Sequence, residues 1–230
     1  MTSICLLNEA NINTAEFSKM VKGAQLFVNE VTKAKNLPTI EVITSPVAGS
    51  QLVHFTMSKR HTSAAAYHAV ENGVPVAYVL PLGKPFGEYT PAVVRWLTKL
   101  VGKVRVNVSI LTKRPASFRP GIITEACHEL VEFIVNPFLD QYSVPDYQGH
   151  EWFLEPADHV FGTFFKMDVD GTSEIFPNFT LDAFYQSQAT PPTFTKLDYC
   201  GIVNTPFSMT LKGYGYCKGP NGTLVKLHTK

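Results

Sequence analysis

The sequence predicts an α+β fold, with a mixed N-terminal half, a central helix and a mainly β C-terminal half. Two stretches, 15–35 and 120–135, repeat apolar residues at helical spacing. Between and after them lie β-branched or aromatic runs bounded by Pro and Gly, a pattern typical of strands. After residue 145, aromatic and turn residues dominate. We expect an α+β part, 1–145, and a β-rich part, 146–230, within one continuous domain.

Composition indicates a folded globular protein and argues against several partners. The chain has 230 residues, of which 45% are hydrophobic and 17% are charged, so a large core is expected. Its net charge is +1 and its Lys and Arg residues are dispersed, so neither nucleic acid nor a membrane surface is indicated. The first residues, MTSICLLNEANINT, lack the features of a signal peptide or anchor. The four scattered cysteines indicate reduced, mostly buried thiols and a cytoplasmic protein.

Individual elements follow from local patterns. A helix is predicted over Ala15–Lys35, with Asn13 or Thr14 as its N-cap, and Leu37-Pro38 ends it. Asp170-Gly171 and Asn221-Gly222 predict hairpin turns. The remaining elements predicted before residue 120 are strands at Thr39–Thr44, Leu52–Met57, Val74–Leu80 and Lys103–Leu111, and a short helix over Thr90–Leu100.

The central helix, predicted over Pro120–Val135, carries a stripe of ionisable residues. Glu125, His128, Glu129 and Glu132 fall at i, i+3, i+4 and i+7, on one face. The other faces are apolar, so the helix should be buried. Burying carboxylates without partners costs several kcal/mol each, and a bound cation would offset that. The alternative is a half-exposed helix whose stripe is solvated.

The order of residues in the stripe favours a metal. His128-Glu129-x-x-Glu132 is the H-E-x-x-H helix of metallopeptidases with glutamate in place of the second histidine. The four-residue spacing allows His128 and Glu132 to bind one ion, while Glu129 faces its open position as a general base. The segment Phe153–Gly162 is the best source of a third ligand, with Glu155 and Asp158 as carboxylates and His150 and His159 as competitors.

Several segments in order resemble a family of zincin-like proteins from tailed bacteriophages, prophages and bacteria. EACHELVEFIVNPF resembles the family's H-E-x-x-E helix, and FLEPADHVFG its later acidic segment of the form E-x-x-D. AYHAVENGVPVAYVL is similar to its upstream strand region. FPNFTLDAFY and FTKLDYCGIVNTPFSMTLKGYGY are similar to its C-terminal β region. The first 60 residues and the Thr90–Leu100 segment have no counterpart. Asn136-Pro137 stands where the family has Asp-Pro, and Cys127 where it has a small hydroxyl residue.

The resemblance implies a zincin-like fold and a zinc site. His128 and Glu132 would be ligands, Asp158 the third ligand and Glu129 the general base. Glu155 would be a further ligand or a group that orients one. Tyr142, Tyr147 and His159 are candidates for stabilising an oxyanion. His54, His61 and His68 are seven residues apart, but their strand-like surroundings favour coincidence.

Three functions remain open at this point. The first is a zinc-dependent hydrolase, with a peptide as the expected substrate. The second is a virion structural protein of the head, neck or tail, with a structural or vestigial metal, that assembles with other virion proteins or with itself. The third is a host-directed binding module without chemistry. The expected location is the cytoplasm of the bacterial host, with incorporation into the virion for the second function.

Overall fold

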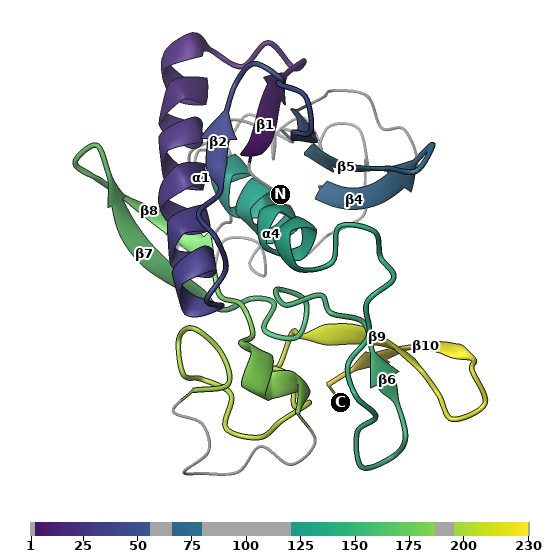
Figure 1. Ribbon diagram of the computed structural model, residues 1–230. Helices are drawn as coiled ribbons and strands as arrows, with labels where there is room; N and C mark the ends of the chain where they lie inside the picture. The colour runs from purple at the N-terminus through teal and green to yellow at the C-terminus, as the bar shows by residue number, and fades with distance from the viewer. Residues whose placement is uncertain (1–2, 56–65, 80–120, 187–195, 230) are drawn as a thin grey trace, which may run out of the picture.

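A computed structural model describes residues 3–55, 66–79, 121–186 and 196–229 of the protein (Figure 1). The predicted helix over Thr90–Leu100 and the predicted strand over Lys103–Leu111 lie outside these residues. The described part contains two α-helices, a mixed five-stranded sheet and smaller antiparallel sheets, with a mostly β C-terminal half. This confirms the α+β class. None of its helices is long and apolar enough to cross a membrane.

The largest sheet is mixed, with the strand order β2-β1-β3-β5-β4. The first four strands in this order are parallel, and β4 pairs antiparallel with β5 at the edge of the sheet. The strands are β1 (Ser3–Asn8), β2 (Glu41–Ile43), β3 (Gln51–Phe55), β4 (Ala66–Glu71) and β5 (Val74–Val79). Strands β2 and β5 fall within predicted strands, and β3 begins one residue before the predicted strand at Leu52–Met57. The sequence analysis assigned no strand to β1, which lies inside the sheet between β2 and β3.

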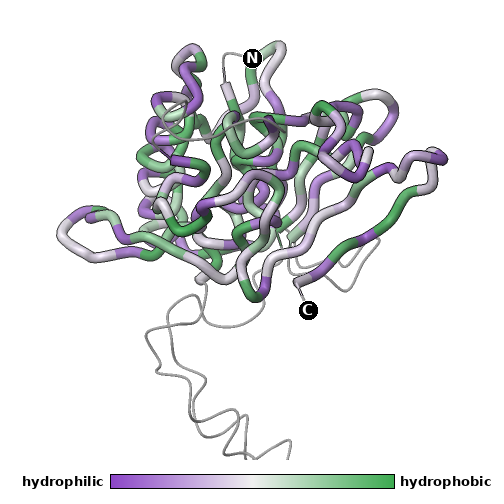
Figure 2. Tube along the Cα trace, turned by 90° about the horizontal axis from the view of Figure 1, so that it is seen from below, coloured by the Kyte–Doolittle hydropathy of each residue, from purple (hydrophilic) through white to green (hydrophobic). Residues whose placement is uncertain are grey.

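Helix α1 (Thr14–Ala34) matches the predicted helix to within a residue at each end. Asn13 caps it, because its side chain accepts a hydrogen bond of 3.0 Å from the Ala15 N–H. One face carries buried residues from Met20 to Val31, while hydrophilic and hydrophobic residues alternate along the turns (Figure 2). This is the pattern of a helix that packs one side against a core.

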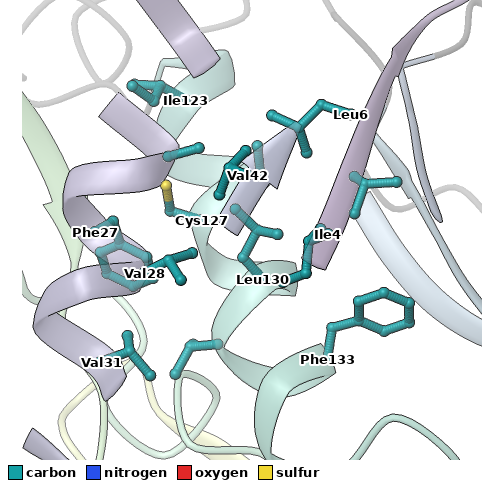
Figure 3. Close-up of a cluster of buried hydrophobic side chains, with 14 of the residues drawn as sticks. Ile4, Leu6, Phe27, Val28, Val31, Val42, Ile123, Cys127, Leu130 and Phe133 are labelled. Carbon is teal, nitrogen blue, oxygen red and sulfur yellow. The ribbon is translucent and has the colours of Figure 1, made fainter. Parts of the chain in front are cut away.

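Helix α4 (Ile122–Val135) lies between the five-stranded sheet and the C-terminal strands (Figure 1). It contacts α1, β4, β5 and β8. Figure 3 shows Cys127 and Leu130 of α4 in the same apolar space as Phe27 of α1 and Ile4 of β1. A Cβ atom at Gly23 would collide with Ile123, so this glycine permits the close approach of α1 to α4. Contact on several sides explains why α4 is apolar nearly all round.

The C-terminal half consists of short antiparallel pairs: β7 (Phe164–Val169) with β8 (Thr172–Pro177), and β9 (Tyr214–Lys218) with β10 (Leu224–His228) and β6 (Glu151–Trp152). Both predicted hairpin turns are confirmed. Asp170 and Gly171 have φ angles of 52° and 77°, as a two-residue turn with positive φ at both positions requires. A 3₁₀ helix, η2 (Asp182–Tyr185), follows β8.

The buried apolar residues form two clusters. The first joins α1, α4, the five-stranded sheet and β8, and the second includes Trp152, Phe184 and Phe207. Ala157 belongs to the first cluster and Val160 to the second. The segment between β6 and β7 therefore passes from one core to the other, with Asp158 at the junction.

Candidate metal centre

The polar stripe of α4 is largely buried. Glu129 is 5% exposed and Glu132 is 4% exposed, while Glu125 and His128 are half-buried. A solvated acidic face, the alternative left open by the sequence, does not describe these two glutamates. Their burial requires compensation from neighbouring groups or from a cation.

Three predicted ligands meet beside α4. The Nε2 atom of His128 lies 3.3 Å from Glu132 Oε1 and 3.1 Å from Asp158 Oδ1. At metal–ligand distances of about 2.0–2.1 Å, the ligand atoms of a tetrahedral ion lie about 3.3 Å apart. The three atoms are therefore spaced to share one small divalent cation.

Asp158 is held in place by the start of β9. The Asp158 carbonyl accepts hydrogen bonds from the Tyr214 N–H at 3.1 Å and the Phe161 N–H at 3.2 Å. Gly213 packs directly on the backbone of His159, where a Cβ atom would collide with the His159 carbonyl. A segment distant in sequence thus positions this carboxylate opposite His128.

Two acidic oxygens of this group lack hydrogen-bond partners. Within the described part of the chain, Glu132 Oε1 and Asp158 Oδ1 are buried and accept no hydrogen bond. Buried polar atoms are normally satisfied, and an exception needs an explanation such as an ion. One histidine nitrogen and two carboxylate oxygens are donors that zinc accepts. The residues present therefore fit the metal that the sequence analysis expected.

Proton affinities reflect the crowding of charge. Burial lowers the pKa of His128, but the neighbouring Asp158, followed by the charges of Glu129 and Glu125, raises it to about 9. Burial and then the charges of Asp158 and Glu129 raise the pKa of Glu132 well above its usual value. A proton and a cation both reduce this repulsion, so the two would compete for the site.

Glu155 lies next to this group and outside it. Burial raises its pKa to about 8, together with the charge of Asp158 and a hydrogen bond to the Asp158 side chain. Among the described residues, Glu155 belongs to neither set of atoms spaced for a shared ion. Of its two predicted roles, the structure favours orienting Asp158.

His68 reaches the same centre from β4. Its Nδ1 atom lies 3.3 Å from Glu129 Oε2, within hydrogen-bonding distance, and 3.7 Å from Glu132 Oε2. The sequence analysis gave His68 no role, because its spacing to His54 and His61 carries no helical meaning on a strand. The Asn72-Gly73 turn that pairs β4 with β5 is a further local signal of its strand, beside the similarity of residues 66–80 to the family's strand region.

The other candidates lie elsewhere. His159 is fully buried among Trp152, Phe184 and Tyr185, and burial lowers its pKa to about 4. Its Nδ1 atom lies 2.9 Å from the Glu155 carbonyl oxygen, so it stabilises the second cluster and its loop. His150 pairs with Asp146, and neither histidine joins a group of candidate ligands among the residues that the structure describes.

The tyrosine at the centre is one that the sequence analysis did not select. Tyr142 packs on Phe153, with ring centroids 4.4 Å apart, and Tyr147 is 84% exposed. Tyr214 instead forms a side-chain hydrogen bond to Asp158, and burial followed by the Asp158 charge raises its pKa. A pocket of ≈ 10 Å³ lies beside His128, lined also by Thr124, Glu125 and Phe161, and holds about one water molecule.

Comparisons of the chain with family models, with curated proteins and with solved structures give no match. The resemblance to the zincin-like family therefore rests on the motifs of the sequence alone. What the structure contributes is a buried His/Glu/Asp cluster suited to a divalent cation.

Proposed function

We propose that this chain is a zincin-like, zinc-binding protein whose ion is held by His128, Glu132 and Asp158. One observation carries the proposal: Glu132 Oε1 and Asp158 Oδ1 are buried without hydrogen-bond partners, both within 3.3 Å of one imidazole nitrogen. Two like charges in this position repel each other unless a proton or a cation lies between them.

The chemistry that fits the centre is hydrolysis of a peptide. A bound zinc ion supplies Lewis acidity, which polarises a carbonyl group and makes a coordinated water more acidic. Glu129 is buried beside the ligands, and its carboxylate is the group that would take a proton from the attacking water. Tyr214, beside Asp158, would donate a hydrogen bond to the developing oxyanion. Two carboxylate ligands weaken the Lewis acidity relative to three histidines, so turnover should be modest.

A structural ion is the second candidate, and the position of the centre favours it. His128 lies on a helix of the first apolar cluster, and Asp158 lies where the chain passes to the second. An ion shared by the two would fasten the C-terminal strands to α4. Among the described residues, the pocket beside His128 has room for about one water molecule. This function suits the virion protein of the family resemblance, assembled with other virion proteins or with itself.

Metal content tests the binding proposal. Untagged protein is dialysed and its metals are quantified by mass spectrometry, beside His128→Ala and Asp158→Asn. We expect at least one equivalent of zinc in the wild type and loss of the His128-bound ion in both variants. His150→Ala is the matched control, because His150 also pairs with a carboxylate but lies outside the centre. A wild-type protein that binds no zinc when zinc is added would contradict the proposal.

Glu129→Gln separates the two functions. In a peptidase this change should lower kcat at least 100-fold, since a positioned general base contributes about 10²–10⁴-fold. The ion at His128 should remain. If the wild type cleaves no peptide and zinc removal lowers its melting temperature, the ion is structural.

A further inference from the structure

His68 lies against the carboxylates of the centre, yet the single-ion mechanism gives it no task. Its side chain is 4% exposed, and those of Glu129 and Glu132 are 6% and 5% exposed. It comes from the edge strand β4, whereas both glutamates come from α4. Two separate elements therefore bring a second imidazole into the buried site.

Glu132 faces the two histidines with different oxygen atoms. Its Oε1 lies 3.3 Å from His128 Nε2, and its Oε2 lies 3.7 Å from His68 Nδ1. A carboxylate placed between two sets of ligands in this way is the usual bridge of a two-metal centre. In such centres the ions lie about 3.5–4 Å apart.

We propose that the centre binds two divalent cations bridged by Glu132, the second held by His68 Nδ1, Glu129 Oε2 and Glu132 Oε2. This inference rests on the proposed metal site at His128. In this second set, His68 Nδ1 lies 3.3 Å from Glu129 Oε2 and 3.7 Å from Glu132 Oε2. Both distances are close to the ~3.3 Å expected between ligand atoms around one small ion. Both sets consist of one histidine and two carboxylates.

The charge of the site supports a second cation. Three carboxyl groups, those of Glu129, Glu132 and Asp158, lie within 3.7 Å of the two imidazoles, more than one ion held by His128, Glu132 and Asp158 would contact. Buried charge without a counter-charge is strongly destabilising, so the second ion removes a repulsion that the first leaves in place.

A hydrogen bond between His68 and Glu129 is the competing explanation. Their 3.3 Å separation suits it, and in that arrangement His68 would orient a general base beside a single ion. The two explanations differ in the number of ions that the protein binds. In the two-ion centre Glu129 is a ligand through Oε2 and keeps its other oxygen for a proton.

Stoichiometry decides between them. The full chain is stripped of metal, titrated with Zn²⁺ and analysed by mass spectrometry after gel filtration. We expect two equivalents in the wild type and one in His68→Ala, a twofold drop. His54→Ala is the matched control, since His54 lies on β3 of the same sheet, separated from β4 by β5, and pairs with Glu9 outside the centre. This variant should keep two equivalents.

A spectroscopic test needs no variant and covers the case in which His68→Ala does not fold. Wild-type protein loaded with Mn²⁺ should give the exchange-coupled paramagnetic resonance spectrum of a manganese pair. One equivalent of metal with the spectrum of an isolated ion would overturn the two-ion centre and leave the proposed function intact. No binding of either metal would overturn both.

Discussion

Asp158 and Asp198 are both buried carboxylates of the C-terminal half, and their surroundings are opposite. Asp198 is 0% exposed, and each of its oxygens accepts a short hydrogen bond: 2.8 Å from Asn178 Nδ2 and 2.6 Å from the Val203 N–H. Asp158 is 4% exposed, and its Oδ1 accepts none among the described residues. Both carboxylates are thus buried. The difference between them is that Asp158 has an oxygen without a hydrogen-bond partner among the described residues, whereas both oxygens of Asp198 have one.

The Asp198 network is closed on itself. Asn178 extends the network to two further residues. Its Oδ1 accepts a hydrogen bond of 3.1 Å from the Cys200 N–H, and its Nδ2 donates one to Thr163 Oγ1. A closed network of this kind ties loops together and leaves no acceptor for a ligand. The Asp158 network is open at Oδ1, where the proposed cation would bind. The predictions below probe this difference.

Asp198→Ala should have the largest effect on stability. It removes one of the two acceptors of the Asn178 amide and the acceptor of the Val203 N–H, at about 1–3 kcal/mol for each group left unsatisfied. We expect the free energy of unfolding to fall by about 3 kcal/mol, measured by urea denaturation with and without zinc. The folded fraction should bind as much zinc as the wild type.

The matched change at the open network is Asp158→Ala. In metal-free protein it removes a charge that repels Glu132 and attracts His128, so we expect a smaller loss of stability than in Asp198→Ala and complete loss of the His128-bound ion. Equal destabilisation by the two variants, without any effect on metal content, would erase the distinction between the networks.

Zinc itself should stabilise the protein through the open network. Free zinc at a hundredfold excess over Kd should raise the free energy of unfolding by about 2.7 kcal/mol, because only the folded chain brings the three ligands together. Thermal unfolding in zinc-buffered solution measures this effect. Asp158→Asn should abolish it and His150→Ala should retain it. A shift that survives Asp158→Asn would place the ion elsewhere.

Much of this architecture is predictable from local sequence, and the exceptions are instructive. The limits of α1 and the two hairpins follow from capping and turn residues, which act within a few positions. Strand β1 was missed because its apolar run is short and its first four residues, Ser3 to Leu6, are all buried, so it shows no alternation. His128, Glu129 and Glu132 are found by helical spacing, since a helix places i and i+4 side by side.

Residues that reach the centre from other elements give no such signal. Asp158 was selected through a resemblance between motifs, whereas His68 and Tyr214 were not selected at all. Each of these two arrives on a strand whose contact with α4 or with Asp158 is formed only by the tertiary fold. The spacing of residues along the chain does not carry that information.

Glu132→Gln should stabilise the metal-free protein. Burial and the neighbouring carboxylates raise the pKa of Glu132 in the folded state, so this group opposes folding increasingly as pH rises above its unfolded pKa. An amide removes that effect, and we expect a gain of about 1–2 kcal/mol at pH 7 in EDTA, with loss of zinc. Thermal unfolding measures the gain.

Glu174→Gln provides the contrast at a satisfied glutamate. Glu174 is buried and forms an ion pair of 2.5 Å with Lys19. Its amide variant should be less stable than the wild type, by up to about 1 kcal/mol. A loss of stability in both variants would mean that the carboxylate of Glu132 is as well accommodated as that of Glu174.

The smallest effect is expected at Asp146, a satisfied carboxylate nearer the surface. It accepts hydrogen bonds from Trp152 Nε1 at 2.9 Å and from the backbone N–H groups of Gln148 and His150 at 2.8 Å and 2.9 Å. Burial raises the pKa of Asp146, but the hydrogen bonds lower it by more, so the pKa lies below its usual value. Asp146→Asn should therefore lower stability by about 1 kcal/mol at pH 7.

The pH dependence follows from the sign of this shift. A depressed folded pKa means that the contribution of Asp146 is complete above the unfolded pKa of about 3.9 and is lost as pH falls through the folded value. The difference between the wild type and Asp146→Asn should therefore shrink between pH 5 and pH 2 in urea denaturation. Asp140→Asn, at an exposed position, should match the wild type throughout. A difference that grows on acidification would mean that the ionised Asp146 destabilises the fold. Hydrogen-bond satisfaction alone would then not distinguish a structural carboxylate from Asp158, the proposed metal ligand.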